Sequence, residues 1–256
     1  MPRFRLTIEY AGTRYSGWQI QKNARTIQGE LHRALGEVLG KTPFETYGAG
    51  RTDAGVHALG QVAHLDTAAN LPPATLVARI NEALPVDINV IDAERVSPRF
   101  HARHSAIARR YLYQISRRRT AFDKPYVWWV KDELNLDTMR AAAQTLVGFG
   151  DFRAFTDDDP EEKSTKVLVD AITIEEDDPL ILIRVVGSHF LWRMVRRIVG
   201  VLVEAGRGGL TPTEVASLMS KESELVARLT APAAGLFLDR VDYEIRTESK
   251  APNPGT

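Results

Sequence analysis

The sequence predicts an α+β protein made of two similarly ordered halves, each with a mainly antiparallel sheet. Two observations support this fold class. The chain has 256 residues and is 44% hydrophobic, which is enough to bury one large core or two smaller ones. In each half, the hydrophobic periodicity gives the same order of elements, β-α-β-β-α-β. A basic stretch with a proline at 97–105, SPRFHARHS, separates the halves.

The first half is predicted to hold four strands and two helices. Apolar and polar residues alternate over 3–10, as in a half-buried strand. The first helix lies between Thr26, a suitable N-cap, and Gly40, a suitable stop. The second helix starts at Pro72–Pro73 and continues to about Leu84. The remaining predicted strands are at 44–48, 60–66 and 87–96.

The second half repeats this order with insertions. Strands are predicted at 106–116, 166–174, 180–187 and 236–245, and helices at 136–147 and 190–204, with two shorter helical pieces before the last strand. This order is typical of a ferredoxin-like unit, an antiparallel sheet with helices on one face. We therefore expect two such units with an active-site cleft between them. The expected domains are residues 1–104 and 105–246, and the polar tail at 247–256 is expected to be disordered.

The composition excludes several classes of protein. The chain has no cysteine, which rules out disulfides, thiolate zinc sites and a thiol nucleophile. Its N-terminus, MPRFRLTIEY, lacks the apolar run of a signal peptide, and arginines interrupt the apolar stretch FLWRMVRRIVGVLV. We expect a cytoplasmic protein without a membrane partner. With 33 basic and 33 acidic residues the net charge is zero, so a nucleic-acid surface requires local clustering of basic residues.

The segment Gly48–Val62, GAGRTDAGVHALGQV, connects two predicted strands and is unusually rich in glycine and charge. Asp53 lies near its centre, two residues after Arg51, so the two can form an ion pair or share a ligand. An aspartate beside a cation stays ionised and can act as a nucleophile or a base. The alternative is an Asx-turn, in which Asp53 bonds its own backbone, and the tripeptide alone favours this turn. We expect His57 to be a hydrogen-bonded turn residue.

Arginines and tyrosines form two further groups of interest. Three arginines of the predicted helix at 190–204 share one side, which suits carboxylates, phosphates or a solvated face. They are Arg193, Arg196 and Arg197. Tyr111 and Tyr113 share a strand face after two arginines, where they can stack on bases or pack in the core.

Histidines give no metal site in this interpretation. His101 and His104 have the i, i+3 spacing of some metal ligands. Arg99 and Arg103 flank them, which disfavours a divalent cation. We therefore expect no metal.

Five ordered stretches resemble the tRNA pseudouridine synthase A family, over about residues 3–245. They are YAGTRYSGWQIQ with RTIQGEL, GAGRTDAGVHALGQV, RRYLYQI, HFLWRMVRRIVG and APAAGLFLDRVDY. The second stretch, GAGRTDAGVHALGQV, resembles the active-site motif of the family. The acidic stretch at 155–172, FTDDDPEEKSTKVLVDAI, fits the family pattern poorly.

The resemblance implies a role for each of five residues. Asp53 corresponds to the catalytic aspartate, and Arg196 to the arginine that pairs with it. Tyr111 corresponds to the tyrosine that stacks on the target uracil, and Leu236 to the apolar residue that closes the pocket. Arg51 corresponds to the arginine that helps to displace the target base.

The resemblance also implies the reaction and the partners. Uridines at the 3′ side of the anticodon stem-loop of tRNA (positions 38–40) become pseudouridines, without cofactor or metal, on a homodimer that binds one RNA with both subunits. The N1–C1′ bond breaks and C5 joins C1′. Asp53 then attacks C1′ or takes a proton from C2′. The alternative is a non-catalytic RNA-binding protein in which Asp53 and Arg51 only form a turn.

Overall fold

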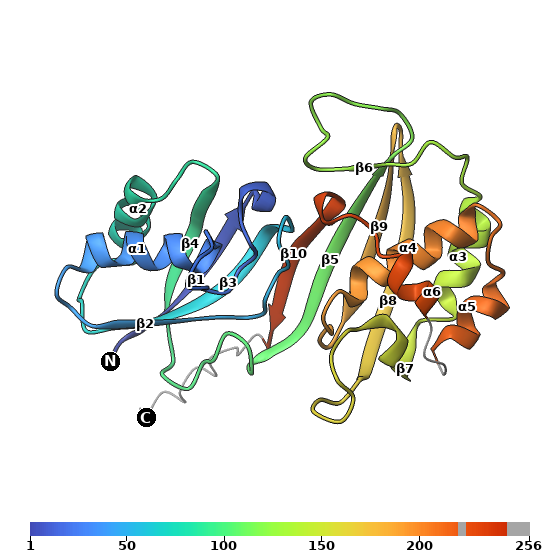
Figure 1. Cartoon of the computed structure of the whole chain (residues 1–256). Helices are drawn as coiled ribbons and strands as arrows, with labels where there is room; N and C mark the ends of the chain where they lie inside the picture. The colour runs from blue at the N-terminus through green and yellow to red at the C-terminus, as the bar shows by residue number, and fades with distance from the viewer. Residues whose placement is uncertain (220–223, 245–256) are drawn as a thin grey trace, which may run out of the picture.

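The computed structural model describes residues 1–219 and 224–244 and confirms the α+β class (Figure 1). The expected disordered tail at 247–256 lies outside the described residues. The strands are β1 (Arg3–Tyr10), β2 (Phe44–Gly48), β3 (His57–Thr67), β4 (Ile88–Val96), β5 (Ala106–Ser116), β6 (Trp128–Trp129), β7 (Gly148–Asp151), β8 (Lys166–Asp177), β9 (Leu180–Gly187) and β10 (Leu236–Tyr243). The helices are α1 (Ile27–Leu39), α2 (Pro73–Ala83), α3 (Leu136–Gln144), α4 (Met194–Gly206), α5 (Pro212–Leu218) and α6 (Glu224–Arg228), with short 3₁₀ turns η1 (Gly12–Arg14), η2 (Arg153–Phe155) and η3 (Ala233–Gly235).

The strands form one ten-stranded sheet, in the order β4-β1-β3-β10-β5-β9-β8-β7, with β2 beside β3 and β6 beside β5. The two predicted sheets are therefore one. The reason is β10, the last strand in the chain, which pairs in parallel with β3 of the first half and antiparallel with β5 of the second. The sheet is otherwise antiparallel within the described residues, apart from the short β5–β6 pair. The ferredoxin-like arrangement of each half and the boundary at 104/105 stay predictions.

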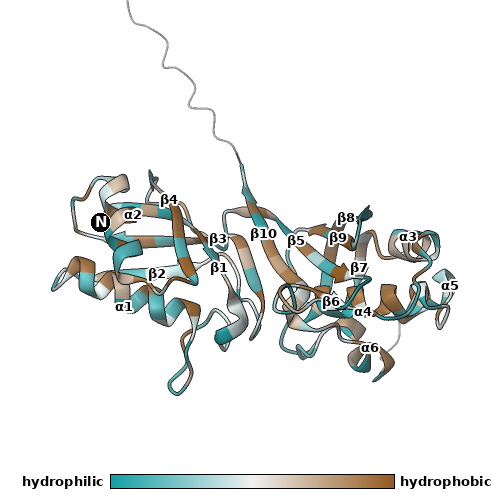
Figure 2. Ribbon diagram, turned by 90° about the horizontal axis from the view of Figure 1, so that it is seen from above, coloured by the Kyte–Doolittle hydropathy of each residue, from teal (hydrophilic) through white to brown (hydrophobic). Residues whose placement is uncertain are grey.

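Two hydrophobic clusters lie on either side of this junction. The first is built mainly from the first half and includes Phe4 and Leu31, and the second, built mainly from the second half, includes Phe152 and Ile198. Tyr111 of β5 packs against both clusters. Seen from above, the halves lie side by side and meet at β3, β10 and β5 (Figure 2). The junction of the halves is thus a packed region formed by segments from both.

Most predicted elements are present, and the differences have local causes. The side chain of Thr26 accepts a hydrogen bond from Gly29 N at 3.2 Å, which confirms the predicted N-cap of α1. The helix predicted at 190–204 begins later, at Met194, because Arg193 takes a left-handed conformation with φ 63°. The helix predicted at 136–147 ends at Gln144, and β7 follows. Across the described ranges, no helix has the length and apolar character needed to cross a membrane.

Candidate active site

The turn that carries Asp53 lies between β2 and β3 and is supported by the loop that follows β1. Trp18 N donates to Thr52 O at 3.1 Å, and the hydroxyls of Tyr10 and Thr52 share a hydrogen bond of 2.8 Å. Gly12 is required here, because a Cβ atom on it would lie 1.9 Å from Val56 O. Residues 10–18, the end of β1 and the loop after it, therefore hold the backbone on both sides of Asp53.

His57 connects this turn to the second half. Its Nδ1 accepts from Gly12 N at 3.1 Å, so the proton is on Nε2, which donates to Pro125 O at 2.9 Å. Burial lowers the pKa of His57, which is 1% exposed, and keeps the imidazole neutral. The expectation of a hydrogen-bonded histidine is confirmed, although His57 is the first residue of β3 and not part of the turn. Its partner in the loop before β6 is not predictable from sequence spacing.

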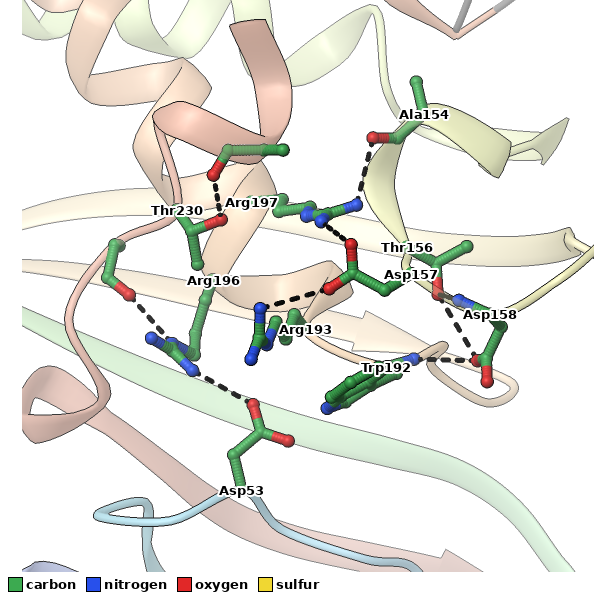
Figure 3. Close-up of polar contacts among 12 residues, drawn as sticks. Asp53, Ala154, Thr156, Asp157, Asp158, Trp192, Arg193, Arg196, Arg197 and Thr230 are labelled. Atoms are coloured by element: carbon green, nitrogen blue, oxygen red, sulfur yellow. Dashed lines mark hydrogen bonds and ion pairs between the residues drawn. The ribbon is translucent and has the colours of Figure 1, made fainter. Parts of the chain in front are cut away.

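Arg196 of α4 contacts Asp53 across the junction of the two halves. Its Nη1 lies 3.1 Å from Asp53 Oδ2 (Figure 3), although the residues are 143 positions apart in the chain. Both side chains are mostly buried, at 17% and 24% exposed. Within the described ranges, the other carboxylate oxygen, Oδ1, accepts no hydrogen bond, and the Asp53 side chain does not bond its own backbone. The Asx-turn interpretation is therefore wrong.

The guanidinium of Arg196 is held in place by a second contact. Its Nε donates to Ala231 O at 2.8 Å, and Ala231 N donates back to Arg196 O at 3.0 Å. This close approach requires a glycine on α4, because a Cβ atom at Gly200 would lie 1.6 Å from Leu229 O. Gly200 thus allows the chain at 229–231 to lie against the helix. The sequence pattern places Gly200 beside the arginines but does not indicate this function.

Tyr111 and Leu236 lie on the adjacent strands β5 and β10. In the β5–β10 pairing, Tyr111 is opposite Leu238, and Tyr113 is opposite Leu236. The Tyr111 ring meets the Phe190 ring edge-on, with centroids 5.2 Å apart. Burial raises the pKa of the Tyr111 hydroxyl, so the phenol stays neutral. The charge of Asp53 is among the groups that raise this pKa further, because the carboxylate lies near the ring.

Arg51 and Tyr113 differ from the residues that gather around Asp53. Arg51 is exposed and forms no hydrogen bond or ion pair with any described residue, so the expected ion pair with Asp53 is absent. Its guanidinium is free to contact a ligand. Tyr113 is fully buried and donates to Pro232 O at 2.8 Å, which makes it the core member of the tyrosine pair.

The acidic stretch that fits the family pattern poorly lies against the start of α4. Asp157 Oδ2 is 3.2 Å from Arg193 Nη1, and Asp157 Oδ1 accepts from Arg197 Nη2. Asp158 accepts from Trp192 N at 3.1 Å. Figure 3 shows Asp157 between Arg193 and Arg197, separate from the pair that Arg196 forms with Asp53. All three arginines of this helix therefore meet carboxylates, as the sequence pattern allowed.

The arrangement provides an aspartate with one oxygen bound by a guanidinium and one oxygen free. Tyr111, a neutral phenol, lies near enough for the charge of Asp53 to act on it, and Leu236, which is 5% exposed, belongs to the hydrophobic cluster that Tyr111 packs against. A guanidinium keeps a nearby carboxylate ionised. A carboxylate of this kind can attack a carbon atom or take a proton from a ligand that occupies the space beside the aromatic ring.

Comparison with known proteins gives a consistent result along nearly the whole chain. The sequence profile of the family described as tRNA pseudouridine synthase matches residues 6–105 and 142–244. A tRNA pseudouridine synthase A from Rhodopseudomonas palustris (strain BisA53) is 43% identical over 247 residues, which cover 95% of this chain and 100% of the relative. The enzyme of that name from Maricaulis maris (strain MCS10) is 43% identical over 246 residues, covering 95% and 98% of the two chains. The one from Exiguobacterium sp. (strain ATCC BAA-1283 / AT1b) is 39% identical over 245 residues, covering 95% and 99%.

Proposed function

Because the chain belongs to the tRNA pseudouridine synthase family, and is therefore an isomerase, we propose that it converts uridines of the anticodon stem-loop to pseudouridines with Asp53 as the catalytic residue. The observation that carries the assignment of Asp53 is its contact with Arg196, 3.1 Å long, together with its free Oδ1. A non-catalytic RNA-binding protein has no need for a carboxylate of this kind beside phosphates. The family membership also does not favour that alternative.

In the proposed reaction, the N1–C1′ bond of the uridine breaks, the uracil turns, and C5 forms a bond to C1′. Asp53 Oδ1 either forms a transient bond to C1′ as N1 leaves, or takes a proton from C2′. In both routes the hydrogen on C5 is lost to solvent after the new bond forms, and N1 gains a proton. The uridine must leave its stack to reach the carboxylate.

The remaining residues have supporting roles in this proposal. Arg196 orients Asp53, because its guanidinium is fixed by Ala231 O. Tyr111 stacks on the detached uracil, and Leu236 closes the apolar side of the pocket. Arg51, exposed and unpaired among the described residues, displaces the target base from its stack.

The choice of uridines and the assembly are also part of the proposal. We place the modified uridines at the 3′ side of the anticodon stem-loop, and the enzyme in the cytoplasm as a homodimer. Mapping of pseudouridines in a tRNA transcript after incubation with the enzyme tests the site. Light scattering tests the dimer, which predicts twice the chain mass of 28.5 kDa.

The first experiment is tritium release from tRNA that carries [5-³H]uridine. Wild type should release tritium, and Asp53→Asn should release none while it still binds tRNA. Asp157→Asn is a matched control, because it also neutralises a carboxylate that contacts an arginine of α4. Equal release from wild type and Asp53→Asn would remove Asp53 from the mechanism, and no release from wild type would remove the proposed activity.

A further inference from the structure

A second group of basic side chains borders the site and has no role in the proposed chemistry. It consists of Arg103, Arg109 and His189, which we call the basic cluster. The three lie close together, because Arg109 donates to the carbonyl oxygens of Arg103 and of Ser188, the residue before His189. Arg103 and His189 are exposed, whereas Arg109 is half-buried.

Arg109 connects three segments of the chain through carbonyl oxygens. Its Nη1 donates to Ser188 O at 2.7 Å and to Ala106 O at 3.3 Å. Its Nη2 donates to Arg103 O at 2.8 Å and to Ala49 O at 3.3 Å. The guanidinium is therefore fixed, and its hydrogen bonds bring Arg103 and His189 to the same place.

The positive charge of the cluster is not balanced by a carboxylate. None of its three members forms an ion pair with an Asp or Glu within residues 1–219 and 224–244. The next residue on β5 differs, because Arg110 pairs with Asp242 at 2.7 Å. Burial lowers the pKa of Arg109, and burial followed by the two arginines lowers that of His189. A partly buried guanidinium without a counter-ion, here that of Arg109, favours binding of an anion.

Three connections place the cluster next to the site. Ala49, which accepts from Arg109, begins the turn that carries Arg51 and Asp53. Arg109 and Tyr111 are two residues apart on β5 and so project from the same face of the strand. His189 immediately precedes Phe190, whose ring contacts that of Tyr111. An anion bound by the cluster is thus adjacent to the base-binding position.

We propose that Arg103, Arg109 and His189 form a phosphate site that binds a backbone phosphate of the RNA next to the target uridine. Arg103 and His189 donate to the phosphate oxygens, and Arg109 supplies charge and holds the other two in place. This inference rests on the proposed function, because the phosphate belongs to the RNA substrate. Phosphate contacts of this kind fix the position of an RNA without reading its sequence.

The test measures tRNA binding at a series of KCl concentrations by fluorescence anisotropy. Arg109 is unsuitable for substitution because it holds three segments together, so the variant is Arg103→Ala, with Arg103→Lys to restore the charge. Arg79→Ala is the matched control, since Arg79 is an exposed arginine on α2 that forms no ion pair with a described residue. Each lost phosphate contact lowers the slope of log K against log[KCl] by about 1.

We expect Arg103→Ala to weaken tRNA binding about 5- to 10-fold at ~0.1 M salt and to lower the salt slope by about 1. Arg103→Lys should recover the slope, and Arg79→Ala should match wild type. A slope for Arg103→Ala equal to that of Arg79→Ala overturns the phosphate site. Tritium release separates the phosphate site from the proposed function. If wild type binds tRNA but releases no tritium, the proposed function is refuted. The salt slopes of the Arg103 variants still decide whether the phosphate site exists.

Discussion

Two carboxylates, Asp53 and Asp157, pair with arginines at the start of α4, and their contacts differ. Asp157 accepts from Arg193 and Arg197 through both oxygens. Asp53 accepts from Arg196 through one oxygen, and its Oδ1 has no hydrogen bond with a described residue. Asp157 also lies in the same half of the chain as its arginines, whereas Asp53 comes from the other half.

The difference matches the proposed division into a structural and a catalytic carboxylate. Both oxygens of Asp157 are engaged within the protein, so it joins the elements that it contacts. Asp53 is held by a single guanidinium contact and keeps one oxygen for the proposed chemistry. The two sites are coupled through α4, because the contacts of Asp157 and Asp158, which we call the helix clamp, hold the start of the helix from which Arg196 projects.

The largest expected effect separates the two carboxylates directly. Asp53→Asn should lower kcat for tritium release at least about 10³-fold, because an amide cannot act as nucleophile or base. Asp157→Asn should change kcat by no more than a few-fold under the same conditions. The measurement is single-turnover release with tRNA bound at saturation. Comparable losses in both variants would contradict the division into reactive and structural carboxylates.

The second prediction concerns the geometry of the reactive pair. Arg196→Lys keeps the positive charge but cannot donate to Asp53 and Ala231 O at the same time through a planar fork. We expect kcat to fall about 10²-fold with a smaller change in KM, since the loss is in orientation. Arg193→Lys serves as the control, as its partner Asp157 keeps the Arg197 contact. Equal losses in the two lysine variants would show that orientation by Ala231 O has no special importance.

The third prediction tests the helix contact that positions Arg196. Gly200→Ala introduces a Cβ atom 1.6 Å from Leu229 O, so the chain at 229–231 must move away from α4. Overpacking of this kind costs about 1–3 kcal/mol of unfolding free energy, and kcat should fall as Ala231 O leaves Arg196. Urea denaturation and tritium release measure the two effects. Gly36→Ala on α1, where a Cβ atom meets nothing within 4 Å, is the matched control.

The fourth prediction concerns stability, to which Asp157 should contribute more than Asp53. Asp157→Asn should lower the free energy of unfolding by about 1–2 kcal/mol, because Arg197 is 3% exposed and loses its counter-ion. This value is reduced from that of a fully buried pair, since Asp157 itself is 34% exposed. Asp53→Asn should lower the free energy of unfolding by less, because only one of the two Asp53 oxygens has a hydrogen bond with a described residue. Urea denaturation of the two variants decides the order.

Patterns in the sequence identified the separate parts of the site, whereas the pairing of Asp53 with Arg196 was predicted only through the family resemblance. Asp53, Arg196, Tyr111 and Leu236 lie in motifs that resemble one family, and each motif is local. The contacts between them depend on tertiary packing: β10 must pair with β3 and β5 before the halves form one sheet. No period or spacing in the sequence encodes that pairing.

The alternatives that the residues alone left open are decided by the same packing. Arg51 is close enough to Asp53 in sequence to form an ion pair with it, yet the carboxylate pairs with Arg196, 143 residues away. The acidic stretch has the composition of a solvated loop, but Asp157 and Asp158 are bound to the start of α4. Charge partners that are distant in the chain are fixed by the fold, so composition alone does not identify them.

The smallest expected effect is a difference in acid sensitivity between the Asp53 turn and the helix clamp. The Asp53 turn is held by the neutral imidazole of His57, whereas the helix clamp contains no histidine. Burial lowers the pKa of His57 in the folded protein, so the unfolded chain binds a proton more readily. The contribution of His57 to stability is therefore complete above the unfolded pKa of about 6.5 and is lost as the pH falls toward the folded pKa.

Acid should accordingly loosen the Asp53 turn before the helix clamp. Hydrogen exchange at pH 7 and pH 5.5, corrected for the intrinsic exchange rate, should show a greater loss of protection at Gly12 N than at Trp192 N, since these amides donate to His57 and to Asp158. The loss at Gly12 N cannot exceed about 1.4 kcal/mol per pH unit for one histidine. In His57→Asn, whose side-chain oxygen can still accept from Gly12 N, this difference between the two amides should disappear. A difference that persists in the variant would assign the acid sensitivity to another group and leave the Asp53 turn no more sensitive to pH than the clamp.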